Sequence, residues 1–289
     1  MANPNQNSLR LVWRGMQGDE RISGATWQPT KESDPIWSMP GLVGAGACNS
    51  THGPALAVDP LNFRRYMVWK GSGGDGRIWT TELSGIENRP RVLAGPEGPF
   101  MTTDRPAIAV LEDQRRLLAW RAPDGALVWA IQEAGGPWSA QVPTDAATSH
   151  GPALVTFEDQ VLMAWKAADD TPIWSAWFKG GGWTVPRPAP MAGGAARTSD
   201  VPALARTDHR LVMAWKGASD AFVWWTERTR GSQWPAPRTA EPSSGAILTS
   251  HGPAVAMARR VLHLEWKEWA INTSGGRSGR TTGGGLPRR

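Results

Sequence analysis

The chain has 289 residues, 31 Lys and Arg against 26 Asp and Glu, and a net charge of +5 at pH 7. The arginines that follow Glu268 come without any acid, so the rest of the chain is close to neutral. A nucleic-acid-binding protein should carry a basic stripe on its folded part, and this balance argues against one. The single cysteine, Cys48, excludes an internal disulfide framework.

Targeting segments are not evident in the sequence. The N-terminal stretch MANPNQNSLRLVW lacks the basic region and the apolar run of a signal peptide. No apolar run approaches the roughly 18 residues that a membrane-spanning helix needs. We therefore expect a soluble protein without membrane insertion, either cytoplasmic or exported by a route that needs no signal peptide.

A tandem repeat occupies most of the chain. One unit begins SHGPALV at residues 149–155 and continues to an apolar run that ends in Trp-Lys at 165–166. The tryptophans that close this run recur at intervals of 45 to 56 residues, at Trp13, Trp69, Trp120, Trp165, Trp215 and Trp266. A period near 50 residues is typical of four-stranded propeller blades and too long for leucine-rich or ankyrin repeats.

Each unit predicts four short strands. The first consists of small apolar residues, as at 54–58, and the second is the apolar run ending in Trp, as at 211–215. The third contains Ile-Trp or Val-Trp, as at 222–225, and the fourth follows a Gly-rich turn. The second strand is apolar at successive positions, which indicates that neighbouring sheets cover both of its faces. Because Pro and Gly interrupt every window that could hold a helix, we predict an all-β fold, a β-propeller.

The blade count depends on how the ring closes. The chain begins on a second strand (9–13), and the first strand of the last unit (253–257) can complete that blade, which gives five blades. Counting second strands instead gives six, so five blades are favoured and six are the alternative. We expect residues 1–271 to form a single propeller domain. Residues 272–289, made mostly of Gly, Ser, Thr and Arg, are expected to form a disordered basic tail.

Polar residues recur at two loop positions that a meander topology places on one face. A His or Asp precedes the Pro that opens each unit, and a Lys or Arg followed by Asp comes after the closing Trp. A pyranose has an apolar C–H face that can stack on an aromatic ring, and its hydroxyls need donors and acceptors. The arrangement predicts repeated sugar sites. The candidate residues are His52, Trp69, Lys70, Asp75, Trp79, Trp120, Asp124, Trp129, His150, Trp165, Lys166, Asp169, Trp174, Trp215, Lys216, Asp220, Trp224 and His251.

Each of these residue types also has a structural explanation. An Asp in a Gly-containing hairpin often bonds to its own backbone, and the closing Trp can pack between blades. The histidine can cap its loop, and the lysine can be solvated. The combination of all four types on one rim favours the sugar site.

The motif SHGPALA followed by MVWKGxGGDxRIW resembles the repeats of Photorhabdus-type β-propeller lectins, over about residues 8–267 and most closely at 50–79. That family is seven-bladed and binds L-fucose and O-methylated or related sugars between adjacent blades. The resemblance implies a multivalent lectin with inter-blade sites for fucose or related sugars. This chain departs from the family because it is too short for seven blades and its last repeat decays. The unit at 103–129 also differs, with Asp104 in place of His and Arg121-Ala122 in place of Lys-Gly.

Two other functions compete with a lectin. The fold also suits a protein–protein interaction propeller. A glycosidase is less favoured, because it needs one distinctive pair of carboxylates, whereas acids here recur once per unit, and the sialidase Asp box is missing. We expect no enzyme and no cofactor. We also expect no metal site, since the histidines lie one per unit. The expected partners are glycans or glycoconjugates rather than nucleic acid, and a homo-oligomer is left open.

Overall fold

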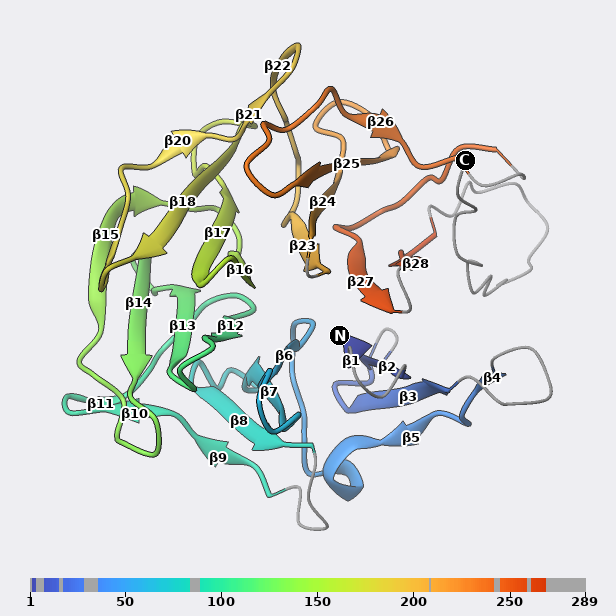
Figure 1. The fold of residues 1–289 in the computed structure, drawn as a ribbon. Coiled ribbons are helices and arrows are strands. Elements are labelled where there is room, and N and C mark those ends of the chain that lie inside the picture. The colour runs from blue at the N-terminus through green and yellow to red at the C-terminus, as the bar shows by residue number, and fades with distance from the viewer. Residues whose placement is uncertain are drawn as a thin grey trace.

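The computed structural model describes residues 2–3, 8–15, 18–28, 36–83, 89–207, 209–241, 245–258 and 261–268. These residues form a ring of small antiparallel sheets around a central axis (Figure 1). The predicted tail at 272–289 and the domain boundary at residue 271 lie outside the described residues. No helix among the described residues is long and apolar enough to cross a membrane.

Five sheets of four or five strands form the blades, which we number 1 to 5. Blade 1 contains β1 (Ala2–Asn3), β2 (Ser8–Arg14), β3 (Ile22–Gln28), β4 (Ile36–Trp37) and β5 (Gly41–Leu42). Blade 2 contains β6 (Ala55–Val58), β7 (Arg65–Lys70), β8 (Ile78–Glu82) and β9 (Arg91–Val92). Blade 3 contains β12 (Ala107–Val110), β13 (Arg116–Arg121), β14 (Ala126–Gln132) and β15 (Val142–Ala147).

Blade 4 contains β16 (Ala153–Phe157), β17 (Gln160–Lys166), β18 (Ile173–Lys179), β19 (Gly182–Trp183) and β20 (Arg187–Pro188). Blade 5 contains β23 (Ala203–Arg206), β24 (Arg210–Lys216), β25 (Val223–Thr229) and β26 (Arg238–Thr239). Three two-stranded sheets complete the fold. They are β10 (Ala94–Gly95) with β11 (Gly98–Pro99), β21 (Pro190–Met191) with β22 (Gly194–Ala195), and β27 (Ala254–Ala258) with β28 (Val261–Glu265). A short 3₁₀ helix, η1 (Val43–Gly46), follows blade 1.

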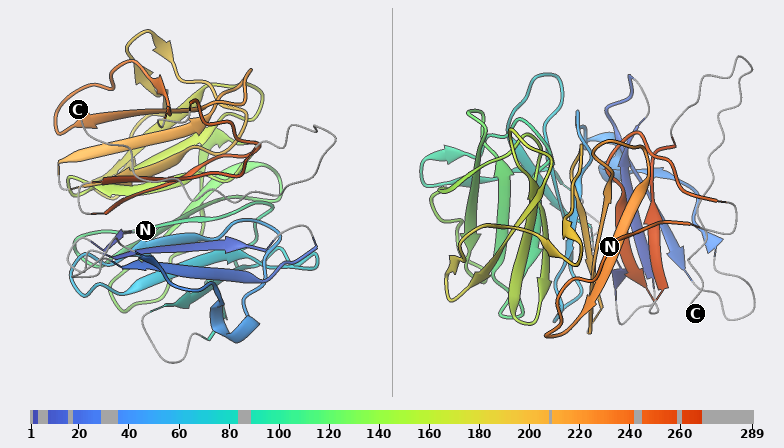
Figure 2. Two further views of the ribbon diagram at one scale, coloured as in Figure 1. Left: turned by 90° about the vertical axis from the view of Figure 1, so that its right-hand side faces the viewer. Right: turned by 90° about the horizontal axis from the view of Figure 1, so that it is seen from above.

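The predicted β-propeller with five blades is confirmed. Neighbouring strands within each blade are hydrogen-bonded mostly in chain order, as in an up-and-down meander. The first strands of successive units lie side by side around the axis, in the order β6, β12, β16, β23 and β27. Figure 2 shows the blades from two further sides, with their strands running along the axis.

Ring closure differs from the expected strand addition. The strand at 253–257 was expected to complete blade 1, but β27 pairs with β28, with Ala254 opposite Glu265. The inner position of blade 1 is occupied by β1 instead, which pairs with β2. The β27–β28 sheet contacts β1 and β2 and so lies between blades 5 and 1. The rings of His263 and Trp27 meet edge to face across this contact, with centroids 5.0 Å apart.

The core lies between the blades, as the apolar second strands predicted. In β24, residues Leu211 to Trp215 are all between 0 and 2% exposed. One cluster joins Leu211 and Met213 of blade 5 to Leu162 and Ile173 of blade 4. Because both faces of each blade pack on neighbours, the stretch 211–215 has no place for a polar residue, and the polar residues of β24 lie at its two ends.

Candidate functional site

The loops that enter the inner strands are organised by a buried hydroxyl. In the loop before blade 4, Thr148 Oγ1 lies 2.6 Å from the carbonyl oxygen of His150 and 2.8 Å from that of Lys166. The threonines at the same position make the same pair of contacts in three other loops: Thr102, Thr198 and Thr249. These side chains are at most 2% exposed. Sequence reasoning missed them, although a Ser or Thr recurs two residues before each His or Asp.

The predicted lysines bond to the protein itself. Lys70 Nζ donates to Thr51 Oγ1 at 3.0 Å and to the carbonyl oxygens of Gly71 and Asp75 at 3.4 Å. Lys216 Nζ makes the equivalent three contacts, and Lys166 Nζ makes two of them. An ammonium has three donors, so Lys70 and Lys216 are fully used in tying the hairpin to the loop. Each of these lysines therefore ties its hairpin to the loop that enters the same blade.

The tryptophans that close the second strands are core residues. Trp69, Trp120, Trp165 and Trp215 are between 0 and 2% exposed and rank among the largest fully buried side chains of the described residues. Trp69 packs against Ile22, Val43 and Cys48 of the preceding unit. These four indoles therefore fill the space between blades and present no ring face at the surface, which corrects their expected place on the rim.

The tryptophans of the third strands lie nearer the surface. Trp79, Trp174 and Trp224 are half-buried, and each pairs across the sheet with the buried Trp of its own blade. Each also packs against the cluster that it shares with the preceding blade. These three indoles thus occupy equivalent places at the interfaces of blades 1/2, 3/4 and 4/5.

A hairpin carboxylate holds two of these indoles. Asp75 Oδ2 accepts the Trp79 indole N–H at 2.8 Å, and both Asp220 oxygens lie 3.3 Å from the Trp224 indole nitrogen. The carboxylates fold back over Gly71 and Gly217, where an added Cβ would lie within 2.6 Å of the Asp side chain. The glycine after Trp-Lys therefore allows the hairpin to place its Asp beside the indole.

Arg77 fixes the charge at the blade 2 hairpin. Its side chain donates to both Asp75 oxygens, at 2.9 and 3.0 Å, and its guanidinium lies 5.1 Å from the centre of the Trp79 ring. These hydrogen bonds to Arg77, with a smaller one from Trp79, lower the pKa of Asp75 to about 2. Asp75 is therefore a carboxylate throughout the physiological pH range. Sequence reasoning missed Arg77, which the Asp-x-Arg spacing could have indicated.

Blades 3 and 4 depart from this pattern. In blade 3 Trp120 pairs with Val128, and Trp129 is displaced by one residue to the opposite face of the sheet, where it packs on Phe178 at 5.3 Å. Within the part of the chain that the structure describes, Asp124 accepts only the backbone N–H of Ala126. In blade 4 the exposed Asp169 makes no hydrogen bond or ion pair within the described residues, and its neighbour Asp170 takes the hairpin position, where it accepts from Arg197 at 3.3 Å.

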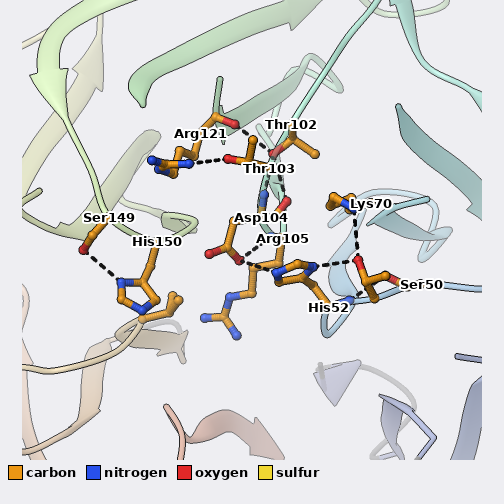
Figure 3. A network of polar contacts seen from close by, with 12 residues as sticks. Ser50, His52, Lys70, Thr102, Thr103, Asp104, Arg105, Arg121, Ser149 and His150 are labelled. Atoms are coloured by element: carbon orange, nitrogen blue, oxygen red, sulfur yellow. Dashed lines mark hydrogen bonds and ion pairs between the residues drawn. The ribbon is translucent and has the colours of Figure 1, made fainter. Parts of the chain in front are cut away.

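The histidines alternate with aspartates around the inner rim, in the order His52, Asp104, His150, Asp200 and His251. The Nδ1 atoms of the three histidines each lie 2.9 Å from the hydroxyl of the preceding residue. His52 Nε2 lies 4.0 Å from Asp104 Oδ1 on the next loop (Figure 3).

Burial lowers the pKa of His52 against the opposing effect of Asp104, and the cations Lys70, Arg14 and Arg105 lower it further. Burial and Lys267 likewise lower the pKa of His251, with Asp200 opposing. Both imidazoles are therefore neutral at pH 7. Among the described residues, no group of three or more His, Cys, Asp or Glu side chains is placed to hold a metal ion.

No protein-family model and no curated protein sequence matches the chain. Solved structures are similar to it. SapL1 lectin in complex with alpha methyl fucoside has a TM-score of 0.65 at 12% identity, over 92% of this chain and 86% of that chain. An Aleuria aurantia lectin mutant in complex with Fucalpha1-6GlcNAc has a TM-score of 0.62 at 11% identity, over 97% of this chain and 92% of that chain.

An enzyme is also among the similar structures. The Hadza microbial sialidase Hz136 has a TM-score of 0.62 at 11% identity, over 92% of this chain but only 62% of that chain. At such identities these likenesses establish the β-propeller fold, and the function must be argued from the site.

Proposed function

We propose that this protein is a multivalent carbohydrate-binding protein that holds sugars at its blade interfaces. The observation that carries the proposal is the recurrence of one unit, a half-buried indole beside a hairpin carboxylate. It occurs as Trp79 with Asp75 and as Trp224 with Asp220. Trp174 with Asp170 has the same spacing in blade 4 and the same interface position.

The unit has the chemistry that a sugar needs. The indole offers an apolar ring to the C–H face of a pyranose. The carboxylate accepts hydrogen bonds from sugar hydroxyls, and Arg77 supplies donors in blade 2. A shallow site of this kind binds near the millimolar range, about −4 kcal/mol. Several sites on one rigid ring raise the avidity for a multivalent glycan by about 10² to 10⁴.

Fucose and related or O-methylated sugars are the preferred candidates. The Ser50–Trp79 motif resembles that of propeller lectins with this preference, and two structurally similar proteins are lectins in complex with fucosides. The buried Trp69, Trp120, Trp165 and Trp215 are not part of the proposed contact surface. The three histidines and the lysines act by supporting the rim.

We propose binding without hydrolysis. A glycosidase needs one carboxyl group that is protonated at its working pH so that it can act as a general acid. Asp75 has a pKa of about 2 because of Arg77, so it cannot supply that proton near neutral pH. The carboxylates of the proposed sites also lie on separate blades, one per interface.

The test is a glycan array followed by calorimetry with alpha methyl fucoside. We expect wild type to bind fucosylated or methylated glycans, and the Trp79→Ala, Trp174→Ala, Trp224→Ala triple variant to lose at least tenfold in affinity. Trp225→Ala is the matched control, because this half-buried indole lies on the same strand, stacked 4.0 Å from the Arg238 guanidinium carbon. Equal loss in the control, or no glycan bound by wild type, would overturn the proposal and favour a protein partner.

A further inference from the structure

One residue of the inner rim breaks the repeat. The position between the His or Asp and the Pro is glycine in three loops, Gly53, Gly151 and Gly252, and valine at Val201. In the loop before blade 3 it is Arg105. A long cation therefore replaces a residue with little or no side chain at one place in the ring.

Arg105 reaches over the mouth of the axial channel. The strands β6, β12, β16, β23 and β27, together with β2 of blade 1, surround a channel of about 480 Å³. Arg105 contributes to its lining together with the prolines that follow the loops. Its Nη2 donates to the carbonyl oxygen of Pro202 at 3.3 Å, on the loop that enters blade 5. The guanidinium thus extends from blade 3 to a loop two blades away.

The Arg105 side chain is held in place but has spare donors. Its Cγ packs against Gly151, where an added Cβ would lie 2.8 Å from it. Among the described residues its guanidinium donates only the bond to Pro202, and a guanidinium has five N–H groups. Most of these donors are therefore available to a ligand.

The nearest carboxylates are already committed to backbone groups. Asp104 Oδ1 accepts the backbone N–H of Arg105 at 2.5 Å. Asp200 accepts the backbone N–H groups of Val201 and Gly252, at 2.6 and 2.9 Å. Neither forms an ion pair with the Arg105 guanidinium within 4.0 Å among the described residues. Both offset part of its charge without taking up its donors.

Cations outnumber carboxylates around His52. Besides burial, Lys70, Arg14 and Arg105 lower the pKa of this histidine, and one carboxylate, that of Asp104, raises it. The Nδ1 atoms of His52 and His150 contact hydroxyls, and the Nε2 of His52 faces Asp104 Oδ1 at 4.0 Å. Figure 3 shows the Arg105 guanidinium in the region between these two histidines.

We propose that the channel mouth at Arg105 binds the carboxylate group of a small molecule, such as an acidic sugar. A guanidinium presents paired N–H donors that match a carboxylate, and burial strengthens such charge-assisted bonds. The site is separate from the interface sites of the proposed function. It uses none of Trp79, Trp174 or Trp224 and does not depend on them.

The experiment is calorimetry with glucuronate, with glucose as the neutral control and acetate as the simplest carboxylate. We expect wild type to bind glucuronate with an affinity that falls as salt is added, and to bind glucose at least tenfold more weakly. Arg105→Gln should weaken glucuronate binding at least tenfold, and Arg105→Lys should weaken it less. Acetate binding as tight as that of glucuronate would show that the carboxylate alone is recognised.

Two results would overturn this proposal. One is wild-type protein that binds neither glucuronate nor acetate. The other is an Arg105→Gln variant that binds glucuronate as wild type does. Arg105→Gly provides a second variant if Gln disturbs folding, because glycine stands at this position in three other loops. Urea unfolding midpoints show whether each variant is folded. Alpha methyl fucoside should bind the Arg105 variants and wild type with equal affinity. Fucoside binding therefore tests the interface sites independently of the Arg105 site.

Discussion

The contact between neighbouring loops makes a sharp prediction about three glycines. Gly53, Gly151 and Gly252 occupy the same repeat position. A Cβ on Gly151 would lie 2.1 Å from Arg105 O, and one on Gly252 would lie 2.4 Å from Val201 O. A Cβ on Gly53 would meet nothing within 4 Å. None of the three has a positive φ, so only the close approach distinguishes them.

The size of the effect follows from these distances. Ordinary contact begins near 3.4 Å, so Gly151→Ala and Gly252→Ala require two loops to separate by about 1 Å. Overpacking of a tight site costs about 1–3 kcal/mol of stability. Because a backbone oxygen cannot rotate away, we expect both variants to lie at the upper end of this range. With an m value of about 2–3 kcal/mol per M, the urea midpoint should fall by about 1 M. Gly53→Ala should leave the midpoint within 0.2 M of wild type, a shift of about 0.5 kcal/mol.

Urea unfolding of the three variants and wild type, followed by tryptophan fluorescence, is the assay. Equal midpoints for the three variants would refute the loop contact, and so would a Gly53→Ala variant that is destabilised as strongly as Gly151→Ala.

Three further predictions concern packing and charge. Lys70→Met should lower the free energy of unfolding by about 1–2 kcal/mol through its lost hydrogen bonds, with fucoside affinity unchanged; a tenfold affinity loss at unaltered stability would instead make Lys70 a ligand contact. Trp129→Ala should cost about 2–4 kcal/mol of stability without changing fucoside affinity, since its ring packs on Phe178; reduced affinity in calorimetry would contradict this. Burial raises the pKa of Glu265 from 4.5 to about 7, so its ionisation opposes folding increasingly between these values and fully above pH 7. Glu265→Gln should therefore stabilise the protein by about 1–2 kcal/mol at pH 8 after solvent screening, but little at pH 4; an equal gain at both pH values in urea titrations would contradict this.

The repeat predicted most of the fold. Strand 211–215 lies within β24, strand 54–58 matches β6, and the run after the last Pro-Ala matches β27. The fourth strand of blade 4, β19 at Gly182–Trp183, lies where the Gly-rich turn placed it. In blade 5 the fourth strand lies further along than expected, since the turn before Trp234 leads to β26 at Arg238–Thr239. Ring closure was not predictable, because a strand that matches the repeat can pair with either neighbour.

The candidate site was predicted in part. The sequence pointed to the loops that carry the His or Asp and the Lys, and it named the half-buried indoles Trp79, Trp174 and Trp224; their role in sugar binding stays a prediction. It could not show that Trp69 and its equivalents are covered by the preceding blade, since burial there depends on residues 20 to 50 positions away. The spacing from the hairpin Asp gives a sharper assignment. The Trp follows Asp75 and Asp220 by four positions. The same count pairs Trp174 with Asp170 rather than Asp169, and it places Val128 rather than Trp129 at the equivalent position of blade 3.

The most direct test of the interface sites is a crystal structure of the protein with alpha methyl fucoside. We predict sugar rings against Trp79, Trp174 and Trp224, at the interfaces of blades 1/2, 3/4 and 4/5. No sugar should lie at the blade 2/3 interface, where Val128 takes the place of the indole. Fucoside bound only away from these three indoles, or equally at blade 2/3, would contradict the account.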